Sequence, residues 1–417
     1  MNSIKNHLPE VNTLGLYRMP WSFSDNPFSW LEPTRNCDLS CEYCYQEHNP
    51  RSYKTVAEFE SDLKGLLKLR KCDAINIAGG EPLIHPDILD IVALVKSHGL
   101  KPVLITNGNR LTKEFARDLK AAGAYGFTFH VDSLQNRPGW EGKDEKELNE
   151  LRQYFADMIF EEGGLVCGFN TTIVPSMLHQ VGNVIKWTIS NNDRVATNMI
   201  IPVRQVPKDD CLEYYAGSQK LDADQTVYAG RYDYRPITAM ELYREALKVV
   251  PDFTFNSYLG GTMVPNAPKW LFANIIASRQ KIYGYLGPKG MEIIQNGFHL
   301  IKGGYISYLR PEIYQHAKLL LPLAAFDKGL RKAFGRYLLS ILTNPLRIFK
   351  KLTFQTIIIM QPQDFLENGE QDMCDGCPNR TYINGRLVSE CRGEDYIKHG
   401  RMIQAVRKVE SVCYVEA

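Results

Sequence analysis

Short apolar runs alternate with longer amphipathic ones from about Trp30 to Val203. The apolar runs predict strands at 29–34, 74–80, 102–108, 125–133, 165–174 and 196–203. The amphipathic runs predict helices at 55–69, 87–97, 112–122, 144–162 and 178–190. Strict alternation of this kind predicts parallel β/α units, with active-site groups at the C-terminal ends of the strands. Six units are fewer than the eight of a closed barrel, so the expected fold is α/β with a partial (β/α)6 barrel.

The alternation stops after Val203. Residues 207–235 predict an irregular insertion, 238–250 a helix and 352–360 a strand. Residues 381–389 predict a hairpin that turns on Asn384-Gly385, a favoured two-residue turn, and 395–410 predict a final helix. The expected division is an N-terminal extension (1–27), the barrel (28–205), a mostly helical insertion (206–353) and a C-terminal α+β domain (354–417).

Cysteine usage indicates metal chemistry. The N-terminal residues lack the basic start, apolar run and cleavage site of an export signal, so a reducing cytoplasmic location is expected and disulfides are not. Six of the ten cysteines fall in two groups, Cys37/Cys41/Cys44 and Cys374/Cys377/Cys391. The other four are expected to be small buried hydrophobes: Cys72, Cys167, Cys211 and Cys413. The net charge of +2 gives no overall attraction to nucleic acid, and no nucleic-acid partner is expected.

The first group places three thiolates within eight residues, directly after a predicted strand. Three thiolates on a short loop can bind three corners of a [4Fe–4S] cluster and leave the fourth iron open to a chelating cofactor. A structural zinc site needs a fourth ligand, and His48 is close enough in sequence to supply one. The spacing alone therefore leaves iron–sulfur and zinc both open.

The Cys-x3-Cys-x2-Cys spacing, with the aromatic Tyr43 before its last cysteine, resembles the signature of the radical S-adenosylmethionine (SAM) superfamily. Gly79-Gly80-Glu81-Pro82 ends the second predicted strand and resembles the GGEP motif with which that family contacts the SAM amino group. Two glycines let a backbone approach a ligand, and a carboxylate can accept from an ammonium. Taken alone, this sequence would equally suit a turn ahead of Pro82. The resemblance covers roughly residues 28–205.

Polar residues at the ends of the later predicted strands add to this resemblance, which implies that they lie near the SAM ribose, its carboxylate or the substrate. Each taken alone is more often a turn or cap residue, and Arg204 equally suits a surface position. The expected cofactor-binding residues are Tyr43, Gly79, Gly80, Glu81, Pro82, Thr106, Asn107, Asp132, Ser133, Asn170 and Arg204.

The second group, Cys374-x2-Cys377-x13-Cys391, encloses the predicted hairpin, so strand pairing is expected to return Cys391 to the first two cysteines. A zinc knuckle with Cys413 as its fourth ligand is one interpretation. The group also resembles the auxiliary-cluster region of SPASM/twitch radical SAM enzymes, which implies a second [4Fe–4S] cluster in residues 354–417. Its spacing is that of the cyclase that begins molybdopterin synthesis, but the chain lacks that enzyme's Gly-Gly terminus, so the GTP substrate is not carried over.

The segment 317–353 is both basic and strongly apolar, with eight lysines and arginines against one acid, Asp327. Such a segment can lie in a membrane interface. The alternative is a pair of amphipathic helices that cover the barrel mouth and are interrupted at Pro345.

The resemblance implies a radical SAM enzyme that forms a 5′-deoxyadenosyl radical and abstracts hydrogen from an unactivated C–H bond. A reducing flavodoxin or ferredoxin is the expected electron donor. The segment 317–353 favours a lipid, isoprenoid or tetrapyrrole-like substrate, with peripheral contact at the inner membrane surface. A maturase of ribosomal peptides is the alternative enzyme. A non-catalytic electron carrier or zinc module is the alternative of another class, and it would not need the Gly79–Pro82 motif.

Overall fold

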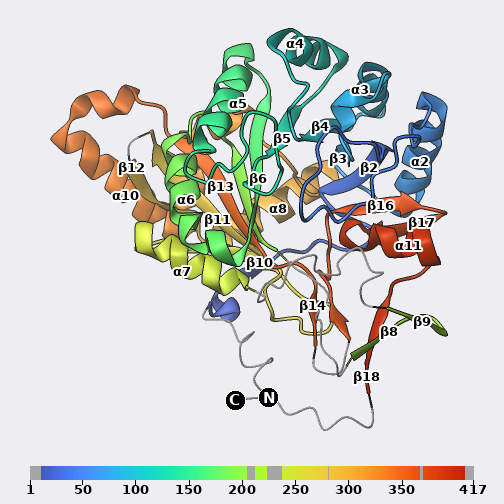
Figure 1. Cartoon of the computed structure of the whole chain (residues 1–417). Coiled ribbons are helices and arrows are strands. Elements are labelled where there is room, and N and C mark those ends of the chain that lie inside the picture. The colour runs from blue at the N-terminus through green and yellow to red at the C-terminus, as the bar shows by residue number, and fades with distance from the viewer. Residues whose placement is uncertain (1–10, 204–211, 223–236, 280, 367–369, 409–417) are drawn as a thin grey trace.

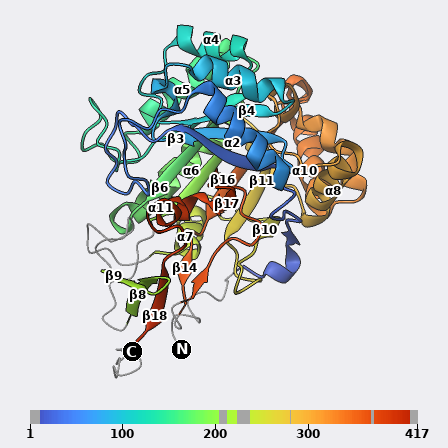
Figure 2. The same cartoon turned by 90° about the vertical axis from the view of Figure 1, so that its right-hand side faces the viewer.

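The computed structural model describes residues 11–203, 212–222, 237–279, 281–366 and 370–408. Its centre is a curved sheet of eleven strands. Figures 1 and 2 show the helices of the first half of the chain along the outside of this sheet.

The first half of the chain forms six parallel strands in sequence order along the sheet. They are β2 (Phe28–Thr34), β3 (Ala74–Gly79), β4 (Lys101–Thr106), β5 (Gly126–His130), β6 (Val166–Ile173) and β7 (Thr197–Pro202). The helices between them are α2 (Val56–Leu69), η2 (Pro82–Ile84), α3 (Ile88–Ser97), α4 (Lys113–Ala122), α5 (Asn149–Glu162), η3 (Pro175–Gln180) and α6 (Val181–Ser190). The predicted α/β fold with a partial (β/α)6 barrel is confirmed, although α5 begins at Asn149 rather than at 144.

The helices pack on the barrel through the apolar positions that the periodicity predicts. Phe59, Leu63 and Leu66 are the buried residues of α2, at the three- and four-residue spacing of one helix face. Between the sheet and α5, the rings of Phe129 and Phe155 stack with their centroids 4.4 Å apart. This layer fixes the directions of the strands, and therefore the positions of the residues that follow their C-terminal ends.

The sheet continues beyond the six parallel strands into later parts of the chain. The additional strands are β1 (Tyr17–Arg18), β10 (Ser257–Leu259), β11 (Trp270–Ser278), β12 (Lys281–Tyr285) and β13 (Thr353–Met360). Strand β13 pairs in parallel with β7 and antiparallel with β11. The prediction that residues 206–353 are mostly helical is therefore wrong for 257–285. Eight of the nine residues of β11 are buried, so the strand shows no alternating pattern that would reveal it.

Further helices lie outside the β/α units, most of them in the second half of the chain. The helices outside the β/α units are η1 (Thr13–Gly15), α7 (Ala239–Val249), α8 (Pro288–Lys302), α9 (Pro311–Tyr314), η5 (Ala317–Ala325), α10 (Lys328–Thr343) and η6 (Pro345–Phe349). The predicted break at Pro345 and the helix predicted at 238–250 are confirmed. Among the described residues, no helix is both long and apolar enough to span a membrane.

For residues 317–353 the sequence left open a membrane interface or two amphipathic helices over the barrel mouth, and the residues just before this segment contact the start of β7. The side chain of Gln315 donates to the carbonyl of Asp193 at 2.7 Å, and the hydroxyl of Tyr314 donates to the carbonyl of Arg194 at 3.1 Å. Both carbonyls lie just before β7, so this part of the chain closes the N-terminal end of the parallel strands.

The C-terminal region packs beside the first strand of the barrel. Its elements, with two short strands that belong to the same region, are β8 (Leu212–Ala216), β9 (Gln219–Leu221), β14 (Asp364–Phe365), β15 (Gln371–Asp372), β16 (Arg380–Ile383), β17 (Arg386–Ser389), η7 (Glu390–Arg392), α11 (Gly393–His399) and β18 (Gln404–Arg407). The predicted hairpin is confirmed, with φ of 48° at Asn384 and 82° at Gly385. Its Tyr382 lies directly over Gly65 of α2, where a Cβ would stand 2.4 Å from the ring.

Two predictions at the edges of this region are wrong. The final helix does not run over 395–410, because α11 ends at Gly400, whose φ is 69°, and β18 then pairs with β8. The insertion at 207–235 is not irregular throughout, because 212–216 and 219–221 form a hairpin. The rest of that insertion, with Arg204, Cys211 and Cys413, lies outside the described residues.

Candidate functional site

The first cysteine group lies on the loop that follows β2, and Cys37, Cys41 and Cys44 all line one cavity. Burial raises the pKa of Cys37 to about 11 and raises that of Cys41 well above its usual value, and the neighbouring thiols add to both effects. Because their pKa values are raised, Cys37 and Cys41 need an added positive charge nearby before both can ionise. A bound metal centre supplies such a charge, and the thiols then release their protons.

Hydrogen bonds with two neighbouring segments hold this loop. The backbone N–H of Glu42 donates to the carbonyl of Leu134 at 2.9 Å. The amide of Asn107 donates to Asp38 at 2.9 Å and lies 3.8 Å from the sulfur of Cys37. Burial alone would raise the pKa of Asp38, but hydrogen bonds, among them those from Asn109 and Asn107, outweigh it and lower the pKa. The carboxylate therefore stays charged and keeps these bonds beside the thiols.

Gly79 and Gly80 let the end of β3 lie against the start of the cysteine loop. A Cβ at Gly79 would stand 2.1 Å from the carbonyl oxygen of Thr34, and one at Gly80 would stand 2.1 Å from that of Asn36. Gly79 also has a φ of 119°, which side-chain-bearing residues rarely adopt. Both glycines line the cavity, so their backbone is available to a ligand.

Glu81 is fully buried and binds protein groups rather than facing the cavity. Its carboxylate accepts from the Thr106 hydroxyl at 2.6 Å, from the Asn107 N–H at 2.7 Å and from the Leu83 N–H at 2.9 Å. Burial raises its pKa to about 7, and these hydrogen bonds limit the rise. Glu81 thus joins the ends of β3 and β4 and positions Asn107, which in turn holds the cysteine loop.

A second polar group follows β5. The ring of His130 lies 2.7 Å from Asp132 and 3.2 Å from the Thr172 hydroxyl, with all three residues on the cavity wall. Asp132 also accepts from the Thr172 N–H at 3.1 Å. Burial would raise the pKa of Asp132, but the charge of and the hydrogen bond from His130 outweigh it and lower the pKa. This pair places an anion and an imidazole beside the cysteine loop.

A buried ion pair supports the residues that follow β5. Arg152 and Glu145 are paired, and neither side chain is accessible to solvent. Glu145 accepts from the Ser133 N–H at 2.8 Å, and Arg152 donates to the carbonyl of Val131 at 2.8 Å. The pair fixes the backbone on both sides of Asp132. Nothing local in the sequence marks it, because Arg152 and Glu145 read as ordinary exposed helix residues.

The second cysteine group returns to the same cavity. Cys374 follows β15, and its backbone pairs with that of Gly261 in an isolated β-bridge. Cys391 lies in η7, directly after the β16–β17 hairpin. A hydrogen bond from Cys374, together with Arg380 and Arg70 nearby, overcomes the effect of burial and lowers the pKa of Cys377 to about 6. The lowered pKa favours the thiolate form of Cys377, which is the form that binds a metal.

Two buried cations anchor the second group, and neither was predicted. Arg70, at the end of α2, donates to the carbonyls of Cys377 at 2.9 Å and Pro378 at 3.2 Å. Lys269 pairs with Asp364 at 2.7 Å and Asp372 at 2.9 Å, with all three side chains buried. These residues are distant in sequence from the cysteines they support, so no spacing could have revealed them.

The two cysteine groups therefore line one cavity of about 520 Å³ inside the barrel. Within the described residues, no three His, Cys, Asp or Glu side chains converge on one point as the ligands of a single metal ion do. Thiolates at the corners of a cubic cluster bind different iron atoms and stand apart around it. The donor set, two groups of three thiols beside an open cavity, fits two such clusters.

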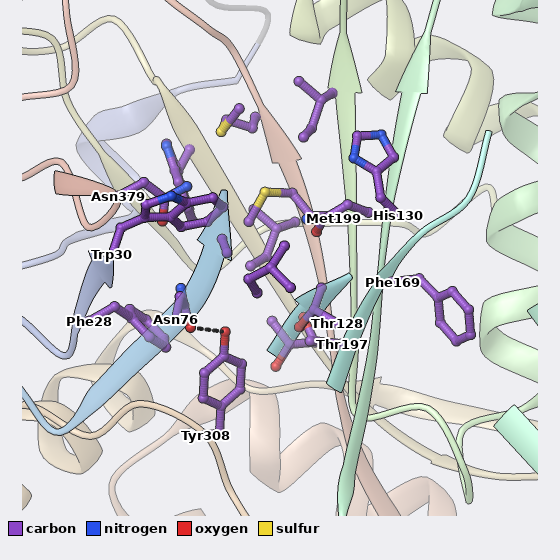
Figure 3. Close-up of a pocket in the computed structure, with 18 of the residues that line it drawn as sticks. Phe28, Trp30, Asn76, Thr128, His130, Phe169, Thr197, Met199, Tyr308 and Asn379 are labelled. Atoms are coloured by element: carbon purple, nitrogen blue, oxygen red, sulfur yellow. Dashed lines mark hydrogen bonds between the residues drawn. The ribbon is translucent and has the colours of Figure 1, made fainter. Parts of the chain in front are cut away.

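The structure brings most of the predicted site residues together. Those that line the cavity are Cys37, Cys41, Tyr43, Cys44, Gly79, Gly80, Thr106, Asn107, Asp132, Asn170, Cys374, Cys377 and Cys391. Glu81, Pro82 and Ser133 stand behind this wall, and Arg204 lies outside the described residues. Figure 3 shows His130 and Met199 toward one end of the cavity and Tyr308 at the other.

Comparison with known proteins agrees with this geometry. Residues 31–175 match the family model of the Radical SAM superfamily. Over 204 residues the chain is 36% identical to a GTP 3′,8-cyclase of Peptoclostridium acidaminophilum, covering 46% of this chain and 60% of the cyclase. Over 167 residues it is 26% identical to an AdoMet-dependent heme synthase of Nitratidesulfovibrio vulgaris, covering 37% of this chain and 42% of the synthase.

Residues 31–175, which form most of the parallel half of the barrel, therefore match a radical SAM domain. The chain spans about half the length of the curated relatives it matches. Among solved structures, SuiB of Streptococcus suis bound to S-adenosylmethionine is similar over 54% of this chain and 47% of its own, with 19% identity and a TM-score of 0.38. Radical SAM enzymes use a [4Fe–4S] cluster and SAM, and the thiols of Cys37, Cys41 and Cys44 line the cavity.

Proposed function

We propose that the chain is a radical SAM enzyme that abstracts hydrogen from an unactivated C–H bond of an apolar substrate. The observation that carries the proposal is the shared cavity, which both cysteine groups line together with Gly79 and Gly80. The match of residues 31–175 to the Radical SAM superfamily supports it independently.

Cys37, Cys41 and Cys44 would hold the cluster that binds SAM, and Cys374, Cys377 and Cys391 would hold an auxiliary one. Once reduced by one electron, the first cluster with bound SAM would supply a 5′-deoxyadenosyl radical that can accept a hydrogen atom from the substrate, with methionine and 5′-deoxyadenosine as products. Gly79, Gly80, Tyr43 and Asn170 line the same cavity as these three cysteines. They would orient SAM and exclude water from it.

His130 and Asp132 would act at the polar end of the cavity. Their hydrogen bond keeps the carboxylate charged and fixes the imidazole ring, because Asp132 also receives the Thr172 N–H. In this position they would hold a polar group of SAM or of the substrate. A small reduced protein, a flavodoxin or ferredoxin, would supply the electron.

The cavity wall favours an apolar substrate. Large apolar side chains from four strands face it, namely Phe28, Trp30, Met199, Trp270, Phe272 and Ile358. Figure 3 shows Phe28, Trp30 and Met199 around the cavity, with the amide of Asn76 and the hydroxyl of Thr128 as the nearby polar groups. A wall of this kind binds hydrocarbon with a few groups that fix its orientation.

The test is the formation of 5′-deoxyadenosine. The protein is purified without oxygen, reconstituted with iron and sulfide, and given SAM and dithionite. We expect 5′-deoxyadenosine from the wild type and from Cys72→Ala, and none from Cys37→Ala. A wild-type protein that contains zinc, or that holds iron but forms no 5′-deoxyadenosine, would instead be a binding module or an electron carrier.

A further inference from the structure

A basic and apolar face, formed by η5, α10 and η6, follows the segment that contacts the start of β7. Nine of the 23 large apolar side chains that are exposed in the described residues belong to it. We call it the basal face: Leu319, Leu321, Phe326, Leu338, Leu339, Leu342, Leu346, Ile348 and Phe349, between 50% and 84% exposed. Scattered exposed hydrophobes are normal, but a group this dense marks an interaction site.

Helix α10 shows how this face arises. Its buried residues Leu330, Ala333, Phe334, Tyr337 and Ser340 form one stripe, which packs toward β12. The opposite stripe is exposed and carries Lys328 and Lys332 in its first half and Leu338, Leu339 and Leu342 in its second. The lysines and leucines on the solvent side of α10 remain exposed in the fold. This stripe is therefore available to a partner.

The charge of the basal face is strongly positive. Its single acid, Asp327, is buried and accepts from the N–H groups of Leu330 at 2.7 Å, Gly290 at 2.8 Å and Gly287 at 2.9 Å. Asp327 therefore caps two helices and adds no exposed negative charge. Of the cations, Arg336 has an exposed acidic neighbour in Asp252 at 3.4 Å. Lys328, Lys332 and Lys350 are exposed at the edges of the apolar cluster.

Lysines and arginines around exposed leucine and phenylalanine side chains match the chemistry of an anionic membrane surface. The apolar side chains can enter the boundary between headgroups and acyl chains, while the cations stay among the lipid phosphates. An apolar protein partner would not need so many cations, and an acidic one would not need so much exposed hydrocarbon. Charge and hydrophobicity together favour the bilayer.

The cavity reaches this face. Ile313 and Leu319 line the cavity and are also 47% and 66% exposed at the surface. Tyr308 closes the same end from inside, donating to Asn76 at 3.1 Å (Figure 3). Figure 1 places α10 on the opposite side of the molecule from the β16–β17 hairpin, which Cys377 precedes and Cys391 follows in the chain. The apolar interior thus runs from the thiols to the basal face.

We propose that the basal face docks the protein on a bilayer that contains anionic lipids, and that the hydrocarbon part of a membrane amphiphile enters the barrel from this side. The docking stands on the surface alone, whereas the entry of the amphiphile rests on the proposed function. The substrate class is then an amphiphile drawn from the membrane rather than a free small molecule.

Flotation of the reconstituted full chain with lipid vesicles tests the docking. We expect the wild type to float with vesicles of phosphatidylcholine and phosphatidylglycerol, and roughly tenfold less with phosphatidylcholine alone or in high salt. The variants Leu342→Glu/Phe349→Glu and Lys328→Glu/Lys332→Glu should each lose roughly tenfold of this binding. The matched control, Leu89→Glu/Tyr154→Glu, alters exposed apolar residues on α3 and α5 and should bind as the wild type does.

The formation of 5′-deoxyadenosine without vesicles separates the two proposals, and all of these variants should retain it. The docking is wrong and the proposed function stands if 5′-deoxyadenosine forms but the wild type does not float with anionic vesicles. The same holds if 5′-deoxyadenosine forms and the basal-face variants float as the wild type does. If the Leu342/Phe349 substitutions instead convert a dimer into a monomer, the face is an interface between two copies and the docking is likewise wrong. Absence of 5′-deoxyadenosine with normal flotation overturns the proposed function and the entry route but leaves the docking.

Discussion

Glu81 accepts a 2.6 Å hydrogen bond from the hydroxyl of Thr106, which joins the C-terminal ends of β3 and β4. The same carboxylate receives the N–H of Asn107, whose side chain holds Asp38 on the cysteine loop. A residue expected to contact a cofactor thus supports the site from within the protein. Its effect on SAM would be exerted through Asn107 and the loop.

Glu81→Ala should therefore lower both stability and cluster content. Removing the carboxylate leaves two N–H groups and a hydroxyl without an acceptor in a buried place, so the free energy of unfolding should fall by about 2–5 kcal/mol. Thermal unfolding and iron content of the anaerobic protein measure the two effects. Glu58→Ala, at the exposed start of α2, is the control and should keep its iron. Equal iron content in Glu81→Ala and the wild type would contradict this role.

The raised pKa of Glu81 predicts a pH dependence. Its pKa rises from 4.5 to about 7 because of burial, so the folded state favours the protonated form. The stabilising contribution is then complete below about pH 4.5 and is lost as the pH rises through 7. Glu81→Gln cannot ionise, so between pH 4.5 and 7 its unfolding free energy should fall less with pH than that of the wild type. Denaturant titrations at each pH measure these unfolding free energies. If they change with pH equally in the wild type and in Glu81→Gln, the pKa of Glu81 is not raised by folding.

Gly80→Ala should displace the cysteine loop. The added Cβ would stand 2.1 Å from the carbonyl of Asn36, next to Cys37, and backbone cannot yield there as a flexible side chain could. We expect reduced iron incorporation and reduced 5′-deoxyadenosine. Gly297→Ala on α8 is the matched control, because nothing lies within 4 Å of its added Cβ. That variant should keep its iron and gain up to about 1 kcal/mol of stability. A Gly80→Ala protein with full iron content would be inconsistent with the packing described here.

Cys72 and Cys167 should resist alkylation in the folded protein. Burial raises the pKa of Cys72 to about 12 and that of Cys167 further still, so almost no thiolate exists at pH 8. Mass spectrometry after iodoacetamide treatment should find both unmodified in the native state and modified after unfolding. Labelling of Cys167 in the native protein would mean that the barrel wall opens, since its side chain is fully buried on β6.

The parallel half of the barrel was predictable because its signals are local. Each of β2 to β7 is a short apolar run next to an amphipathic helix, and Cys37, Gly79 and Thr106 each stand where such a run ends. Strand β13 was predicted as a strand, but its place beside β7 was not, since pairing across more than 150 residues leaves no local pattern. Strand β11 was not predicted, because both of its faces are covered and its sequence therefore shows no alternation of apolar and polar residues.

The supporting residues of the site were not predictable from spacing. Arg70 looks like a basic residue at a helix end, and only the fold brings it to the carbonyl of Cys377, 307 residues later. Lys269 likewise meets Asp364 and Asp372 only because β11 and β13 are neighbours. Glu81 was placed in the right motif, but its orientation depends on Thr106 and Asn107, which the next strand supplies.

Electron paramagnetic resonance of the variant Cys374→Ala/Cys377→Ala/Cys391→Ala tests the central claim most directly, because only the first cysteine group then remains. The account predicts a reduced [4Fe–4S] signal in this variant that changes when SAM is added, with 5′-deoxyadenosine formed in the same sample. An iron-free protein, or a cluster signal that SAM leaves unchanged, would contradict the assignment of Cys37, Cys41 and Cys44 as the site of SAM chemistry.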